Sequence, residues 1–185
     1  MGRGRCFLVV MMVFLSTSNV RAEQPEGFSL TGGIVNHSLS DSTEEDYKTS
    51  GISITGDYQW MINEPWTINM FITSSGEEAE QCPLDDCLVS HLIMPGVEGR
   101  FWMDQFFMGL HMGIFQQMRS ATVNGEVVET EGVGISTGLS LGYAWPNGYL
   151  ISLMTESASV QYVRGASKTS GLRLQFGYRW RALGD

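Results

Sequence analysis

The sequence is poor in basic residues, in cysteine and in histidine. Of its 185 residues only 11 are lysine or arginine, against 20 aspartate or glutamate, with three cysteines and three histidines. A chain this acidic repels a phosphate backbone, which argues against nucleic acid as a partner. Beyond residue 22 no apolar run reaches the roughly 20 residues that a membrane helix needs. Hydropathy alone would therefore describe a soluble secreted protein.

The N-terminus has the pattern of a secretory signal peptide. Two arginines precede a short apolar core at residues 6–15, and small residues follow at the cleavage positions that end at Ala22. We therefore interpret residues 1–22 as the signal peptide and residues 23–185 as one domain. Cleavage removes three of the 11 basic residues and no acidic one, so 8 basic and 20 acidic residues leave a net charge of −12.

The clearest structural signal is strict alternation of apolar and polar side chains near the C-terminus. One face carries Leu172, Leu174, Phe176, Tyr178 and Trp180, and the other carries Arg173, Gln175, Gly177 and Arg179. A period of two marks a strand with two different faces. In a soluble sheet the apolar face packs inward, whereas in a membrane barrel it faces lipid and the arginines face the lumen.

Seven further segments can form strands of this kind. The full set of expected strands is 27–36, 51–60, 65–73, 89–102, 106–115, 132–145, 149–155 and 171–180. In the fourth, the apolar residues change parity, and we expect a bulge at Pro95-Gly96 to flip the faces. Short connections, at 61–64, 103–105 and 146–148, alternate with long ones. This alternation predicts an all-β, eight-stranded, antiparallel up-and-down transmembrane barrel with short periplasmic turns and long extracellular loops.

Aromatic residues gather beside the short turns and at the end of the last strand. All five tryptophans belong to this set, in which we place Trp60, Trp66, Trp102, Trp145, Tyr149 and Trp180. They would lie at one height and form an aromatic girdle at a membrane interface. A soluble barrel gives no reason for every tryptophan to lie at one rim.

With these features the chain resembles the small eight-stranded outer-membrane proteins, namely the OmpA membrane domain and the OmpX/Ail group. The residues that carry the resemblance are Phe176-Gly177-Tyr178-Arg179-Trp180, which look like the Gly-Tyr-Arg-aromatic ending of that group. The resemblance implies an integral protein of the bacterial outer membrane whose last strand is read by the barrel-assembly machinery. Here five residues follow Trp180, where that group usually ends on the aromatic residue.

The polar faces of the strands assign six ionisable residues to the lumen. They are Asp57, Glu98, Arg100, Glu156, Arg173 and Arg179, three acids and three bases. We interpret them as an ion-pair network inside a filled barrel, with a proton or ion path as the alternative. If Tyr149 lies opposite Trp180, Glu156 and Arg173 are cross-strand neighbours and should form an ion pair. A diffusive porin is disfavoured, since eight strands leave no open channel.

The long connections carry most of the acidic residues. The acids are Asp41, Glu44, Glu45 and Asp46 in the first, Glu77, Glu78, Glu80, Asp85 and Asp86 in the second, and Glu126, Glu129 and Glu131 in the third. They are either solvated loops or contacts for divalent cations, although no EF-hand spacing is present. Cys82 and Cys87 are expected to form a disulfide at the tip of the second loop, in preference to a metal site.

Histidine offers little for catalysis. His37, near Ser38 and Ser40, and His91, after Ser90, could be posed as bases, but neither matches a deacylase or protease motif. We expect a monomer without catalytic residues, metal or cofactor. The expected function is envelope structure or surface interaction through acidic loops, with outer-membrane lipid or lipopolysaccharide and an extracellular protein as partners. The alternatives are an adhesin or host-factor binder and a lipid A-modifying enzyme.

Overall fold

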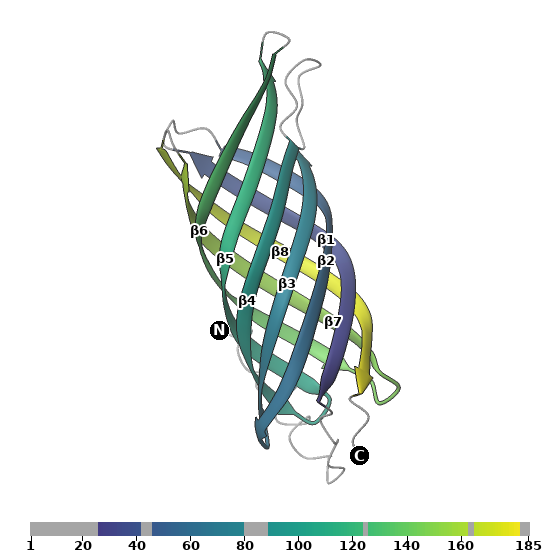
Figure 1. The fold of residues 1–185 in the computed structure, drawn as a ribbon. Helices are drawn as coiled ribbons and strands as arrows, with labels where there is room; N and C mark the ends of the chain where they lie inside the picture. The colour runs from purple at the N-terminus through teal and green to yellow at the C-terminus, as the bar shows by residue number, and fades with distance from the viewer. Residues whose placement is uncertain (1–25, 42–45, 80–88, 124–125, 163–164, 182–185) are drawn as a thin grey trace, which may run out of the picture.

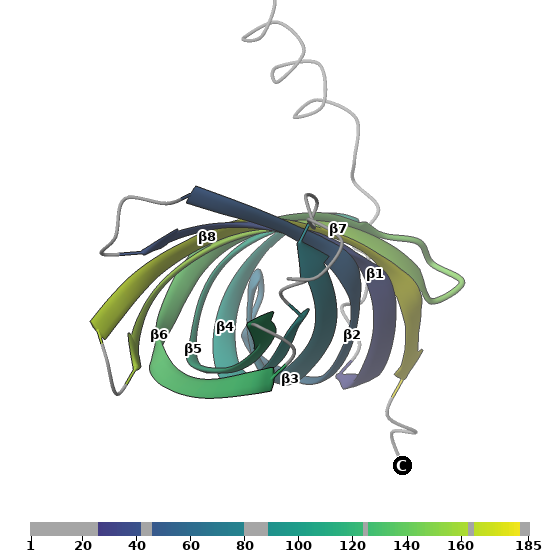
Figure 2. The ribbon, with the colours of Figure 1, turned by 90° about the horizontal axis from the view of Figure 1, so that it is seen from above.

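The computed structural model describes residues 26–41, 46–79, 89–123, 126–162 and 165–181. They form eight strands: β1 (Gly27–Asp41), β2 (Asp46–Asn63), β3 (Trp66–Ala79), β4 (Val89–Met103), β5 (Phe106–Val123), β6 (Glu126–Ala144), β7 (Tyr149–Tyr162) and β8 (Gly165–Arg181). Each strand pairs antiparallel with the next, and β8 pairs with β1 to close the barrel (Figures 1 and 2). The predicted fold class is confirmed. None of the described residues forms a helix that is long and apolar enough to span a membrane.

The strands are strongly tilted against the barrel axis, as Figure 1 shows. Following paired residues around the barrel from Phe28 on β1 leads through all eight strands and back to β1 at Ser38, ten residues further along. With normal strand spacing this stagger corresponds to a tilt of about 40°. The stagger matters for the interior, because residues from distant parts of the sequence meet at the same depth.

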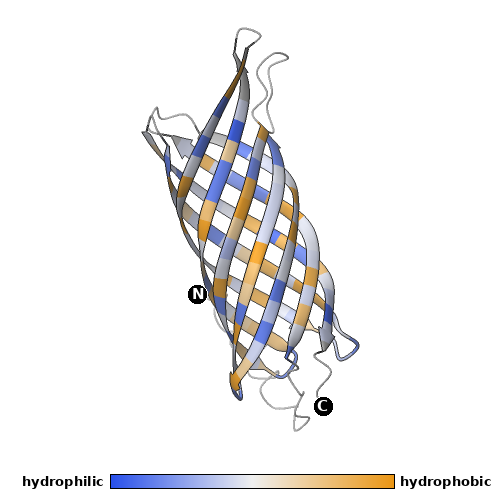
Figure 3. Ribbon diagram, in the orientation of Figure 1, coloured by the Kyte–Doolittle hydropathy of each residue, from blue (hydrophilic) through white to orange (hydrophobic). Residues whose placement is uncertain are grey.

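An apolar band surrounds the outside of the barrel. Hydrophobic and hydrophilic residues alternate along the strands (Figure 3). Between the short turns and the middle of the barrel, the exposed residues of each strand are mostly large and apolar. The upper border of the continuous band is formed by Ile34, Ile52, Ile72, Ile93, Ile114, Val133, Leu153 and Leu172, in strand order. The next outward residues are polar: Asn36, Ser50, Ser74, His91, Gln116, Glu131, Thr155 and Ser170. From Trp180 to Leu172 the band is about 20 Å deep, close to the apolar band of a membrane barrel.

The strands continue well past this band, and this corrects the expected loop lengths. β3 reaches Ala79 instead of residue 73, β5 ends at Val123, and β6 begins at Glu126. Outward faces above the band are mostly polar, with Met118 and Val127 as exceptions, so the hydropathy of the sequence gives little sign of strands there. Seven acidic residues that we expected in loops therefore lie within strands: Asp41, Asp46, Glu77, Glu78, Glu126, Glu129 and Glu131.

β4 continues without the expected bulge. Its register with β3 is unbroken through Pro95-Gly96, so the faces do not flip. Leu92 and Met94 consequently point inward, where they pack with Phe115 in an apolar cluster. The full set of that cluster is Phe71, Leu92, Met94, Phe115, Ala158 and Val160. The barrel holds apolar residues inside, which the strict parity of the lipid face did not predict.

Five of the six predicted girdle residues point outward beside the short turns. Trp60, Trp66, Trp145, Tyr149 and Trp180 are between 37 and 49 % exposed. Trp102 is the exception, because it is only 4 % exposed and lies in the lumen. Its indole nitrogen donates to Thr67 Oγ1 at 2.9 Å. Trp102 therefore seals the short-turn end of the interior and does not belong to the girdle.

Candidate functional site

The first polar group in the lumen lies near the short turns and is centred on Arg100. Arg100 Nη2 is 2.7 Å from Glu98 Oε2, and its Nη1 is 3.9 Å from Asp57 Oδ1. Ser29 donates to Asp57 and Ser140 donates to Glu98. We call Asp57, Glu98 and Arg100 the Arg100 cluster. Four strands contribute to it or to its hydrogen bonds, so it ties both sides of the barrel together.

Arg179 lies toward the short-turn end of the same region. Its guanidinium carbon is 5.0 Å from the centre of the Trp102 ring, an arrangement that allows a cation–π interaction. Arg100 lies in the same way over Phe107, at 4.5 Å. Both arginines are at most 6 % exposed. The two aromatic rings thus cover the two guanidinium groups at this end of the lumen.

The second polar group lies deeper toward the opposite end and contains two residues that the sequence analysis did not assign to the lumen. His37 Nδ1 is 2.7 Å from Glu77 Oε2, and His37 Nε2 contacts Glu156 Oε1. Arg173 Nη2 donates to Glu156 Oε1 at 3.0 Å. All four side chains are essentially inaccessible to solvent. We call His37, Glu77, Glu156 and Arg173 the His37 cluster.

The contacts of His37 fix its protonation state. An ionised carboxylate only accepts hydrogen bonds, so with Glu77 and Glu156 both ionised the two ring nitrogens both donate, as in the imidazolium form. The described buried ionisable groups then include four acids, Asp57, Glu77, Glu98 and Glu156, against Arg100, Arg173, Arg179 and His37 as cations. With His37 protonated, these eight groups balance as four negative and four positive charges. Balance is expected, because an unpaired buried charge is costly.

The register that we expected between the last two strands is wrong by two residues. Tyr149 lies opposite Tyr178 and not opposite Trp180, and Glu156 lies opposite Gly171. Glu156 and Arg173 nevertheless share the inward face and touch as diagonal neighbours. Gly171 leaves room at this point, since a Cβ there would collide with the His37 ring. The glycine is thus what allows His37 to reach across to Glu156.

His111 lies between the two clusters and is 4 % exposed. Its ring packs edge-on against Phe71, with centroids 6.0 Å apart. Neither ring nitrogen has a hydrogen-bond partner in the described part of the chain. Glu156 Oε2 and two nitrogens of Arg173 are also buried and unpaired there. Ordered water commonly satisfies buried polar atoms of this kind.

Bulky side chains fill the lumen above and below these groups. Phe107, Phe115, Leu39 and Leu92 are among the largest side chains that are fully buried. Arg119 lies nearest the open end, donates to Gln117 and Ser167 and stacks on Tyr162. The interior is therefore a packed core with polar and apolar layers.

Two features mark the outer surface beyond the apolar band. On the side of β4, the pairing of β5 ends at Val89–Ser120. On the side of β7, the pairing of β6 ends at Gly132–Tyr162. Residues 121–123 of β5 and 126–131 of β6, which we call the projecting hairpin, extend past them and stand highest in Figure 1. The other feature is a pair of exposed lysines, Lys48 and Lys168, in register with Ser38 and Ser40 on the two sides of β1.

The histidines that we posed as catalytic bases are unsuited to that role. His37 has both nitrogens engaged by carboxylates, and its place is the lumen and not a loop. His91 is exposed on the outward face of β4. Among the described residues no group of three or more His, Cys, Asp or Glu side chains could hold a metal ion. Residues 1–22, Cys82 and Cys87, and the tail from residue 182 lie outside the described residues.

Sequence reasoning missed His37 and Glu77 because it ended the strands where the outward apolar residues end. The alternation itself continues, since both residues keep the inward parity of their strands. Extending that parity past the apolar band would have placed both in the lumen.

No family model matches the sequence, and no curated protein matches it. Solved structures do match. The attachment invasion locus protein Ail of Yersinia pestis superposes with a TM-score of 0.64 at 14 % identity, covering 84 % of this chain and 99 % of that one. Neisserial surface protein A gives 0.61 at 15 % identity, covering 85 % and 100 %. OprG of Pseudomonas aeruginosa gives 0.51 at 11 % identity, covering 89 % and 100 %.

The fold and the two-sided surface define the class of this protein. It is a small eight-stranded outer-membrane β-barrel, with an apolar band toward lipid and a packed, charge-paired interior. The expected resemblance to barrels of the Ail type is confirmed at the level of the fold. A closed barrel with this apolar band is an integral membrane protein of the outer-membrane type.

Proposed function

We propose that this barrel is a non-catalytic surface protein that binds an extracellular protein through the projecting hairpin. The observation that carries the proposal is that the edges of the hairpin have no strand partner among the described residues. No described residue of β4 or β7 pairs with residues 121–123 or 126–131, so within that part of the chain the backbone N–H and C=O groups of these edges have no ladder partner on that side. An exposed strand edge is a site where another extended segment can add.

The side chains of the hairpin support the same function. Val127 and Val128 are 66 and 48 % exposed, and Met118 below them is 48 % exposed. Exposed apolar side chains on a projecting ribbon favour contact with a protein. Glu129 and Glu131 lie beside them and are exposed. The acidic flank favours a partner segment with basic residues, by charge complementarity.

One of the similar barrels, Ail of Yersinia pestis, was also solved with a heparin analogue, sucrose octasulfate. That ligand is a polyanion. The acidic hairpin of this chain has the opposite electrostatic preference, so we propose a protein ligand here and not a sulfated glycan. The packed lumen favours a binding role over transport, and the engaged nitrogens of His37 disfavour lipid A modification.

The remaining expectations belong to the same proposal. Residues 1–22 would direct export, a disulfide between Cys82 and Cys87 would form in the oxidising periplasm, and the barrel-assembly machinery would insert the chain through β8. The barrel would act as a monomer. Lipopolysaccharide would contact the outward rim, where Lys48 and Lys168 lie above the apolar band.

The test is a binding assay on cells that display the barrel. Val127→Lys together with Val128→Lys should reduce adhesion to immobilised extracellular-matrix protein by several-fold, whereas the matched change Thr130→Lys should have a smaller effect. Folding of each variant is checked by the mobility shift on boiling in detergent. Adhesion that survives replacement of residues 121–128 by a two-residue turn would refute the hairpin as the binding element.

A further inference from the structure

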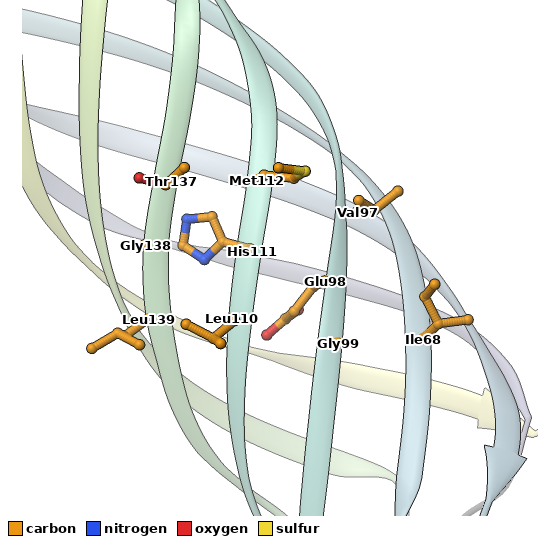
Figure 4. A pocket seen from close by; sticks show the side chains of 10 residues that line it. All are labelled: Ile68, Val97, Glu98, Gly99, Leu110, His111, Met112, Thr137, Gly138 and Leu139. Atoms are coloured by element: carbon orange, nitrogen blue, oxygen red, sulfur yellow. The ribbon is translucent and has the colours of Figure 1, made fainter.

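A groove crosses the lipid-facing surface of β3 to β6 (Figure 4). Paired residues form its two walls: Ile68, Leu110 and Leu139 on the periplasmic side, and Val97, Met112 and Thr137 on the other. The floor is the stretch of strand between these rows, at Glu98, His111 and Gly138. Its volume is about 510 Å³, within the range of roughly 300–1,000 Å³ that is usual for small-molecule sites.

The periplasmic wall of the groove is broken at Gly99. In register Gly99 lies between Ile68 and Leu110, and it faces outward. A Cβ placed on Gly99 would meet no atom within 4 Å, so the gap is open space. By contrast, the Phe28 ring covers the outward Gly56, at 3.6 Å from the place that a Cβ would take there. Gly99 thus forms an uncovered notch into the groove.

The notch opens toward the aromatic girdle. Phe101, two residues along β4 toward the periplasmic turn, packs against Trp66 with ring centroids 5.0 Å apart. Girdle aromatics lie at the level of the lipid headgroups. A chain that starts at the periplasmic headgroup level and runs into the membrane would therefore reach the notch first and then the groove.

We propose that the groove holds one acyl chain of a phospholipid from the periplasmic leaflet, which enters through the Gly99 notch. The groove belongs to the apolar band that faces lipid, and its walls are aliphatic except for Met112 and Thr137. Met112 is flexible and can adapt to a chain. A flexible chain gains dispersion contacts on two walls and a floor, where a flat barrel surface offers only one side. The held chain would exchange more slowly than the other lipids around the barrel.

The full mature chain, folded into phosphatidylethanolamine–phosphatidylglycerol vesicles, tests this directly. The vesicles contain a trace of phosphatidylethanolamine with a photoactivatable diazirine in one acyl chain, and labelled residues are mapped by mass spectrometry. We expect labelling of the groove walls on β4 to β6 to exceed that of the outward residues of β1 and β8 by about three-fold or more. Gly99→Trp should abolish this excess.

The matched control is Gly32→Trp, at another outward glycine in the apolar band, where the nearest atom to a Cβ is the Ser53 carbonyl oxygen at 3.9 Å. Gly32→Trp should leave the excess labelling of the groove unchanged. If Gly99→Trp does not fold, Gly99→Leu fills the notch with a smaller side chain and should still reduce the excess labelling. Uniform labelling around the wild-type barrel would overturn the proposal, as would an excess that persists in folded Gly99 variants. Crosslinks between two barrels through β4 to β6, in place of lipid adducts, would overturn it in favour of a second copy.

Discussion

Replacing His37 by alanine is the most informative perturbation of the interior. The imidazolium donates to Glu77 at 2.7 Å and also to Glu156, and its removal leaves four buried carboxylates against three arginines. Thr49 and Ser75 still donate to Glu77, at 2.7 and 2.8 Å, so that carboxylate keeps part of its solvation. Breaking a buried ion pair costs about 3–5 kcal/mol, and the surviving hydroxyls place the expected loss of unfolding free energy near the lower value.

The measurement is equilibrium unfolding by denaturant in detergent micelles, followed by tryptophan fluorescence. The double variant His37→Ala, Glu77→Gln restores the balance of three acids and three arginines, and should regain at least half of the loss. The single variant Glu77→Gln serves as the control. Two outcomes would show that His37 is not a charged link between the two carboxylates. One is a loss below about 1 kcal/mol for His37→Ala, which is the level of an ordinary hydrogen bond. The other is a double variant that is no more stable than His37→Ala.

Two further predictions concern the packing of the barrel interior and the contact of its outer surface with lipopolysaccharide. In the same unfolding assay Leu92→Ala should lower the free energy of unfolding by about 2–5 kcal/mol, because it opens a cavity in the inner apolar cluster. The neighbouring change Ile93→Ala, on the outward face, should cost clearly less because lipid can fill the space. Equal costs would contradict the assigned faces. Replacing Lys48 and Lys168 together by alanine should weaken the thermal stabilisation by lipopolysaccharide by about 1 kcal/mol per lysine, an effect that should fade at high salt; an unchanged stabilisation would exclude the two lysines as phosphate contacts.

The sequence alone was sufficient for the class of fold and for the sidedness of most residues. Period-two alternation places Leu174 and Arg173 on opposite faces whatever the strand pairs with, because parity is a local property of an extended chain. The same parity collected most of the aromatics at the short-turn end, and it placed all six predicted ionisable residues in the lumen. It also placed Trp102 inward, which the expected girdle overlooked.

Local patterns were weakest where the outside of the strand is polar. Above the apolar band, strands and loops have similar composition, so the expected ends of β3 and β5 fall several residues too early. Pro95 led to the opposite kind of error. Its missing N–H interrupts the ladder with β5, which passes from Ile93 to Gly96, but the chain stays in register and no bulge is needed.

Which inward groups meet was decided only by the closed tertiary structure. His37 contacts Glu77 and Glu156, which are 40 and 119 residues away in the sequence. Contacts across the lumen depend on the stagger of the whole barrel, which combines the registers of all eight strand pairs. An error of two residues between β7 and β8 therefore shifts which inward residues lie at the same depth, although Glu156 and Arg173 still touch diagonally. The sequence therefore determined the two faces of each strand, and the closure of the barrel determined the charge network and the lipid-facing groove.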